Sequence, residues 1–262
     1  MLKLCANISM LFNELPFLQR YQAAADQGFV GVECLFPYEF NVDEVASAIH
    51  HCGIPQVLIN TSAGHWLAGD RGLACDINRQ QDFQQSVKQA LDYALAMGKP
   101  LVHVMAGLVP HGVSLEAAEG VYVNNLRWAA TEANKLDIRL TMEAINPVDM
   151  PRYLLSNQAQ CLRLLKLIKA DNLGLQFDFF HCQKHEGNAL KQFKQLLPHL
   201  FHVQIAGVPE RHEPNTGELD YAPVFRSLEA SAYEGYVGCE YRPKAGTLEG
   251  LGWMSRYSPK RL

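Results

Sequence analysis

Four short apolar segments in the second half of the sequence carry a polar side chain at or next to their carboxyl ends. The segments are residues 138–143, 173–178, 201–205 and 236–240, and the polar side chains are Glu143, Asp178, Gln204 and Glu240. If the segments are neighbouring parallel strands, these side chains meet at one end of the sheet. Three carboxylates confined to one small cleft repel one another, and a divalent cation removes that conflict. The pattern therefore predicts a metal site.

The expected ligand atoms are all oxygen, because neither Cys nor His is needed to complete the set. Oxygen ligands favour a hard ion, Mg²⁺ or Mn²⁺, over Zn²⁺. Such an ion can hold the carbonyl and hydroxyl oxygens of a sugar-like substrate and stabilise the charge of an enediolate. Glu143 and Glu240 arrive from different strands, and we expect them to act as the base and acid that move a proton between neighbouring carbons.

An anionic substrate needs cationic or N–H partners, because its carboxylate must leave water. Arg71 and Lys184 are the expected cations by position, and His181, three residues after the aspartate of the predicted metal site, is expected to orient substrate or a ligand carboxylate. Glu33 and Asn60 end earlier strands and are expected to line the mouth of the site. A proline-flanked loop after the seventh strand is interpreted as a lid. The residues predicted to contact substrate are Asn60, Arg71, His181, Lys184, His212 and Glu213.

The elements that position these residues alternate short apolar runs with longer amphipathic segments, which is the pattern of βα units. Eight strands are expected, at residues 3–8, 31–35, 56–59, 101–105, 138–143, 173–178, 201–205 and 236–240. Helical spacing fills the intervals, for example at residues 14–27, 81–97, 115–135 and 220–231. Eight units predict a closed (β/α)8 TIM barrel of the α/β class. The alternative, a doubly wound open sheet, lacks its usual Gly-rich turn after the first strand.

One domain spanning residues 1–262 is expected, with an irregular tail from about residue 254. The chain has 262 residues, of which 48% are hydrophobic and 19% are charged, which suits a globular enzyme with a sizeable core. The net charge of -4 argues against a broad basic surface for nucleic acid or an anionic membrane. A small sugar acid is therefore the expected partner. The sequence leaves the oligomeric state open, a homo-oligomer included.

The cysteines and the N-terminal segment indicate the expected cellular compartment of the protein. Seven cysteines without a Cys-x-x-Cys pair argue against a disulfide framework and against a structural zinc site. The first residues turn polar at once, and no apolar run approaches the roughly 18 residues of a membrane span. We therefore expect a cytoplasmic protein.

Several segments resemble the hydroxypyruvate isomerase family. They are residues 6–12 (ANISMLF), 31–33 (GVE), 35–38 (LFPY), 68–72 (AGDRG), 202–207 (HVQIAG) and 238–241 (GCEY). The resemblance covers nearly the whole chain. It implies a xylose-isomerase-like barrel in which the positions matching Glu143, Asp178, Gln204 and Glu240 bind the metal. It also implies that the two glutamates carry protons.

Two further segments, residues 103–107 (HVMAG) and 181–184 (HCQK), look closer to the 2-oxo-tetronate isomerase branch of that family. Residues 143–147 blend features of both branches. The expected substrate is therefore a 2-oxo-tetronate, converted from the 2-dehydro to the 3-dehydro isomer, or the pair hydroxypyruvate and tartronate semialdehyde.

Three other functions compete with this interpretation. A ketose 3-epimerase uses the same barrel, but the relatives considered place His where Gln204 stands. A metal-dependent DNA-repair nuclease would need more His ligands and a basic groove for phosphates. A non-catalytic sugar-acid binding protein would keep the barrel without needing a complete set of carboxylates.

Overall fold

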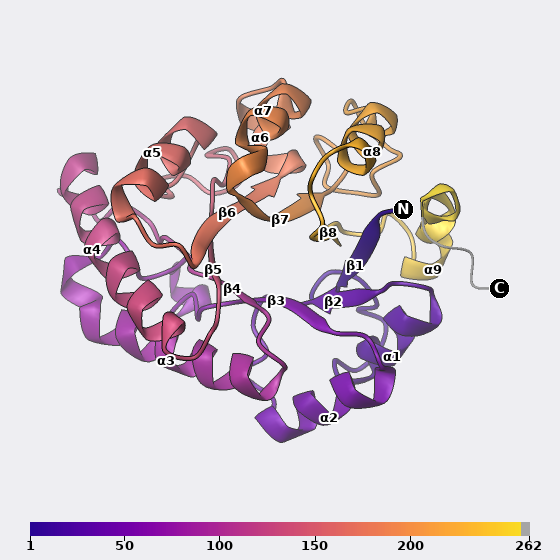
Figure 1. Cartoon of the computed structure of the whole chain (residues 1–262), viewed down its shortest axis with the longest axis horizontal. Coiled ribbons are helices and arrows are strands. Elements are labelled where there is room, and N and C mark those ends of the chain that lie inside the picture. Colours follow the sequence, from indigo (N-terminus) through magenta and orange to yellow (C-terminus); the bar gives the residue numbers. More distant parts are fainter. Residues whose placement is uncertain (258–262) are drawn as a thin grey trace.

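Eight parallel strands close into one barrel in the computed structural model, which describes residues 1–257 (Figure 1). The barrel closes where the first strand pairs with the last, with Lys3 opposite Tyr236. The predicted (β/α)8 fold is thus confirmed, and the predicted strand ends differ from the observed ones by at most two residues. The strands are β1 Lys3–Asn7, β2 Gly31–Glu33, β3 Gln56–Asn60, β4 Leu101–His103, β5 Leu140–Glu143, β6 Leu173–Asp178, β7 Leu200–Ile205 and β8 Tyr236–Cys239.

Helices surround the barrel on its outside (Figure 1). They are α1 Gln19–Asp26, α2 Val42–Cys52, α3 Gln80–Ala96, α4 Leu115–Asn134, α5 Gln158–Ile168, α6 Phe179–His185, α7 Ala189–Leu196, α8 Tyr221–Ala230 and α9 Thr247–Gly250. Short 3₁₀ helices are η1 Trp66–Ala68, η2 Ile77–Arg79, η3 Leu197–His199 and η4 Leu251–Arg256. No helix within residues 1–257 is both long enough and apolar enough to cross a membrane.

Local sequence explains why the helices begin where they do and which face they bury. Five of the α-helices start at a residue whose side-chain oxygen accepts a hydrogen bond from a backbone N–H two or three residues later, and these caps are Asn41, Ser114, Asn157, Asp178 and Asp220. Apolar residues then recur at helical spacing. In α3 the buried side chains include Phe83, Val87, Ala90, Leu91 and Ala94. This stripe packs toward the strands and leaves the polar face in solvent.

Two predicted boundaries are wrong. The first helix begins at Gln19 rather than at residue 14, because the Glu14 carboxylate accepts a hydrogen bond of 2.7 Å from the backbone N–H of Thr247 and Pro16 intervenes. The chain is also regular beyond residue 254. Trp253 stacks on Phe225 with ring centroids 5.9 Å apart, and this packing holds η4 against α8. The rest of the predicted irregular tail, from residue 258 onward, lies outside the described residues.

The inside of the barrel is unusually polar. Side chains from strands that are not neighbours meet there: Glu33 of β2 contacts both His202 and Gln204 of β7. TIM barrels more often fill this space with branched apolar side chains. Buried polar groups cost free energy unless they are hydrogen-bonded, so the interior is held together by matched donors and acceptors.

Candidate active site

The four residues predicted as metal ligands converge at the carboxyl end of the barrel. Glu143 and Asp178 end β5 and β6, Gln204 lies near the end of β7, and Glu240 directly follows β8. All four side chains are buried. The predicted convergence is therefore present in the fold, although the binding of an ion by these residues stays a prediction.

Two further side chains each join two of the four predicted ligands. The Gln176 amide nitrogen donates to Glu143 Oε2 at 3.2 Å and to Gln204 Oε1 at 2.8 Å. On the other side, Arg211 Nη2 donates to Asp178 Oδ2 at 3.3 Å and to Glu240 Oε2 at 2.7 Å. Gln176 and Arg211 thus hold the carboxylates in place from opposite flanks.

Burial and mutual repulsion perturb the carboxylates. Desolvation raises the pKa of Glu143 well above its ordinary value, and the neighbouring charges of Glu240 and Asp178 raise it further. Burial also raises the pKa of Glu240 to about 8, although Arg211 opposes the shift. The pKa of Asp178 is raised by burial against the same guanidinium. The three acids could therefore all be ionised near neutral pH only with more positive charge beside them than Arg211 supplies.

The donor set fits a divalent cation. Three carboxylates around one guanidinium leave two negative charges, which one divalent ion would balance. Glu143 Oε1 is buried and has no hydrogen-bond partner within residues 1–257. The available donors are carboxylate and amide oxygens, the ligands that Mg²⁺ and Mn²⁺ prefer.

His181 lies beside this cluster, as predicted. Its Nδ1 accepts from the backbone N–H of Asn146 at 3.4 Å, and Arg211 Nη1, which can only donate, lies 3.3 Å from its Nε2. That nitrogen is 3.7 Å from Asp178 Oδ2. Burial lowers the pKa of His181 well below its usual value, and the charges of Arg211 and Lys184 lower it further. His181 is therefore a neutral ring that lies between Asp178 and Arg211.

Lys184 and Arg71, the two predicted cations, have different surroundings. Lys184 Nζ contacts Asp149 Oδ1 at 2.7 Å, so its charge already has a partner. Arg71 stacks on the Trp66 ring at 3.8 Å and donates to two backbone carbonyl oxygens. Within the described part of the chain it forms no ion pair. Arg71 is thus the less compensated of the two cations.

His212 and Glu213, the two predicted lid residues, join two loops at the mouth. His212 Nδ1 lies 2.8 Å from the carbonyl oxygen of Arg242. The buried Glu213 carboxylate accepts from the backbone N–H of Lys244 at 3.1 Å. These contacts attach the loop after β7 to the loop after β8. Their predicted contact with substrate stays untested.

Asn60 ends β3 and is buried, and its Oδ1 has no hydrogen-bond partner among residues 1–257. His103 lies opposite it at the end of β4, and neither of its ring nitrogens has a hydrogen-bond partner there. Burial lowers the pKa of His103 to about 3, with a contribution from His202, so the ring is neutral. Its Nδ1 is 3.7 Å from Glu143 Oε2. Asn60 and His103 thus leave free polar atoms beside the carboxylates.

Sequence reasoning missed His103, Gln176 and Arg211 as site residues. The first two had a signal: His103 ends a strand, and Gln176 precedes Asp178 by two residues and so faces the same side of β6. Arg211 had none, since it lies in an irregular loop.

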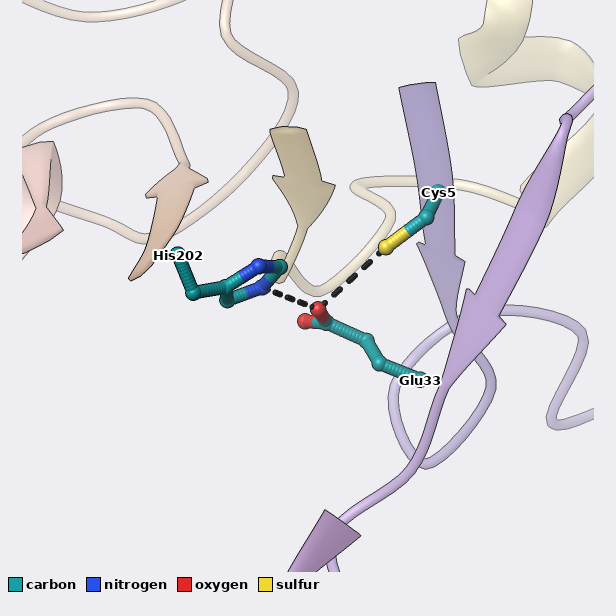
Figure 2. Close-up of side chains that lie close together, drawn as sticks. All are labelled: Cys5, Glu33 and His202. Carbon is teal, nitrogen blue, oxygen red and sulfur yellow. Dashed lines mark hydrogen bonds and ion pairs between the residues drawn. The ribbon is translucent and has the colours of Figure 1, made fainter. Parts of the chain in front are cut away.

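Glu33 lies inside the barrel and contacts the cluster from below. Figure 2 shows His202 and Cys5 directed at its carboxylate. The distances to Glu33 Oε2 are 2.6 Å from His202 Nε2 and 3.3 Å from Cys5 Sγ. Burial would raise the pKa of Glu33, but the charge and hydrogen bond of His202, together with hydrogen bonds from Gln204 and Cys5, hold it below its usual value. Glu33 is therefore an ionised carboxylate.

Comparison with known proteins supports this assembly of barrel and polar mouth. The xylose isomerase-like TIM barrel family matches residues 21–257. The chain belongs to this family. A 2-oxo-tetronate isomerase from Cupriavidus necator is 43% identical over 97% of this chain and 98% of its own. The hydroxypyruvate isomerase of Escherichia coli is 40% identical over 98% of this chain and 100% of its own.

A solved structure has nearly the same backbone as this chain. It is a crystal structure described as AP endonuclease, family 2 from Brucella melitensis, with a TM-score of 0.95 and 40% identity over 98% of this chain and 100% of that one. The resemblance seen in the sequence is thereby confirmed. Both isomerase branches expected there are found among the relatives, so the substrate stays open between them.

Proposed function

We propose that this chain is a metal-dependent isomerase that moves a carbonyl group between neighbouring carbons of a small sugar acid. The observation that carries the proposal is the buried cluster of Glu143, Asp178, Gln204 and Glu240, whose three carboxylates, once ionised, would leave two negative charges after Arg211 is counted. Relatives named as isomerases of small sugar acids, at 40% and 43% identity, support it.

The four residues of the cluster would hold Mg²⁺ or Mn²⁺. When bound, the ion supplies a positive charge that stabilises the negative charge developing on substrate oxygen. Glu143 and Glu240 would exchange protons with the two reacting carbons. The pKa of Glu240, about 8, suits this task, because a general base works best when its pKa lies near the working pH. Arg211 keeps Glu240 from taking up a proton too readily.

The substrate would enter from the carboxyl end of the barrel. A pocket of about 750 Å³ lies there, lined by residues that follow β1, β2, β3 and β8, among them Met10, Phe36, Trp66 and Arg242. Arg71 stacks on one of these walls, the Trp66 ring. A substrate carboxylate can pair with a guanidinium that lacks an acidic partner. We therefore propose a 2-oxo-tetronate, or hydroxypyruvate and tartronate semialdehyde, as substrate.

A nuclease function, which the description of the Brucella structure names, has less support here. Binding of a nucleic-acid backbone requires a basic surface that releases counterions. This chain has a net charge of -4, and three of the side chains buried at its mouth, Glu143, Asp178 and Glu240, are carboxylic acids.

The deciding experiment follows the conversion of candidate substrates by the purified chain. 2-Oxo-tetronates, hydroxypyruvate, tartronate semialdehyde and free ketohexoses are each incubated with Mg²⁺ or Mn²⁺ in deuterated water, and products are read by NMR. We expect isomerisation and deuterium exchange with a sugar acid, abolished by a chelator and restored by the metal. Turnover of ketohexoses alone would indicate an epimerase, and no turnover of any substrate would favour a binding protein.

A further inference from the structure

Glu33 has every acceptor site of its carboxylate occupied. Oε1 accepts from Asn7 Nδ2 at 3.1 Å and from Gln204 Nε2 at 2.8 Å, and Oε2 accepts from Cys5 and His202 (Figure 2). The side chain is completely buried. All four neighbours turn a donor toward it, so the carboxylate only accepts hydrogen bonds in this arrangement.

Gln204 must donate to Glu33 through its amide nitrogen, and this requirement fixes the orientation of the amide group. With Nε2 directed at Glu33, Oε1 must point the other way, where it accepts from Gln176 Nε2 at 2.8 Å. Gln176 in turn accepts on its own oxygen from Thr141 Oγ1 at 3.1 Å. The hydrogen bonds run in one direction from Thr141 to Glu33. Reversing either amide would place two donors or two acceptors against each other.

We propose that Glu33 is a positioning residue that presents the Gln204 oxygen to the metal. Gln204 is the neutral member of the proposed ligand set, and an amide can bind a hard cation only through its oxygen. If the residue at position 33 could also donate a hydrogen bond, the Gln204 amide could rotate and present its NH₂ group to the ion. This inference rests on the proposed function, because it assumes that Gln204 is a ligand.

The rest of the barrel interior is shaped to keep Glu33 in this place. Gly238 on β8 leaves the space that the carboxylate fills: a Cβ atom there would come within 2.5 Å of Glu33 Oε2. Cys5, Glu33 and His202 also lie close enough to hold an ion of their own. Their hydrogen bonds already satisfy the carboxylate, and the three side chains are fully buried, so hydrogen bonding accounts for this group without a second ion.

The test measures the affinity of the full chain for Mn²⁺ by electron paramagnetic resonance. Glu33→Gln keeps the size of the side chain and removes its accept-only character. We expect Mn²⁺ to bind on the order of 10-fold to 100-fold more weakly, the usual effect of losing a partner that orients a ligand. The matched control is Glu119→Gln on α4, a hydrogen-bonded glutamate outside the barrel, which should leave the affinity unchanged.

A double-mutant cycle separates positioning from a general effect on stability. In a Gln204→Ala background the amide is gone, and Glu33→Gln should then change the Mn²⁺ affinity by less than about 2-fold. An equal loss in both backgrounds would overturn the inference, since it would show that Glu33 acts without Gln204. Unchanged affinity of the single Glu33→Gln variant would overturn it as well, while leaving the proposed function intact.

Should Glu33→Gln not fold, Gly238→Ala displaces the carboxylate without changing its chemistry, and a comparable loss of affinity is expected. A crystal structure of the unchanged chain with Mn²⁺ gives an independent answer. Gln204 must coordinate through Oε1 while its Nε2 stays on Glu33, and a Gln204 released from Glu33 in that complex would refute the inference. If the unchanged chain binds no Mn²⁺, both this inference and the proposed function fail.

Discussion

Arg211 reaches from the loop after β7 to Glu240, directly after β8, and places its Nη2 2.7 Å from Glu240 Oε2. The same nitrogen contacts Asp178, so one guanidinium lies between two of the three acids of the cluster. Its charge lowers the pKa of Glu240 against the effect of burial. The arginine thus tunes one of the two proposed proton carriers.

Arg211→Met should shift the pH dependence of the reaction. Removing the positive charge raises the pKa of Glu240 further, so the acidic limb of the kcat/KM profile moves to higher pH, and kcat/KM near neutrality falls by about 10-fold or more. Arg163→Met on α5, which breaks an exposed pair with Glu119, is the control. An unshifted profile would remove Arg211 from the tuning role.

Glu143→Gln and Glu240→Gln should each nearly abolish turnover. Glutamine keeps the side chain's size but carries no exchangeable acid proton, and a placed acid or base contributes about 100-fold to 10,000-fold. The measurement is kcat on the substrate identified above, with Glu132→Gln on the exposed face of α4 as control. Near-normal kcat in either variant would exclude that glutamate as a proton carrier.

The metal-free chain should lose stability as the pH rises. The folded pKa of Glu240 is about 8 against an ordinary value of 4.5, so its contribution to stability is present below 4.5 and is lost as the pH rises through 8. The loss is at most about 5 kcal/mol for this group. Mn²⁺ binds the ionised form, so the rise in Tm on adding Mn²⁺ should grow with pH. Calorimetry with and without the ion checks this, and a Tm shift that shrinks toward high pH would contradict it.

Arg71→Ala should raise KM for an anionic substrate and leave kcat nearly unchanged. Loss of a charged contact to a carboxylate costs about 1.5 to 3 kcal/mol, or roughly 10-fold to 100-fold in KM. Arg139→Ala is the matched control, because Arg139 also stacks on an aromatic ring, that of Phe201. It lies at the opposite end of the barrel, just before β5. Equal KM values for both variants would place the substrate carboxylate elsewhere.

Glu213→Ala should destabilise the chain, because it removes the buried carboxylate that accepts a hydrogen bond from the backbone N–H of Lys244. The expected cost is about 1 to 3 kcal/mol, measured by urea unfolding. An increase in KM without any loss of stability would instead show that Glu213 contacts substrate directly.

Much of the fold and part of the site follow from local patterns in the sequence. The βα repeat locates all eight strands, and the ends of β5 and β6 identify Glu143 and Asp178, because the spacing of polar residues along one strand is a local property. The course of a loop depends on contacts with residues far away in the sequence. No local pattern therefore indicates that the Arg211 side chain reaches the carboxylates. The contact between Glu33 and His202 joins residues 169 positions apart across the barrel, and no periodicity specifies which side chains meet there.

The space beside Gly238 has a consequence for how this family can diverge. The glutamate at position 33 and the missing side chain at position 238 fit together as a pair, since a methyl group at 238 would overlap the carboxylate. Position 238 is thus not free to gain a side chain while the glutamate keeps its place. A descendant that gains a larger residue at position 238 must first replace the glutamate at position 33. That replacement also removes the acceptor that orients residue 204. Positions 33, 204 and 238 are therefore expected to co-vary in an alignment of many relatives.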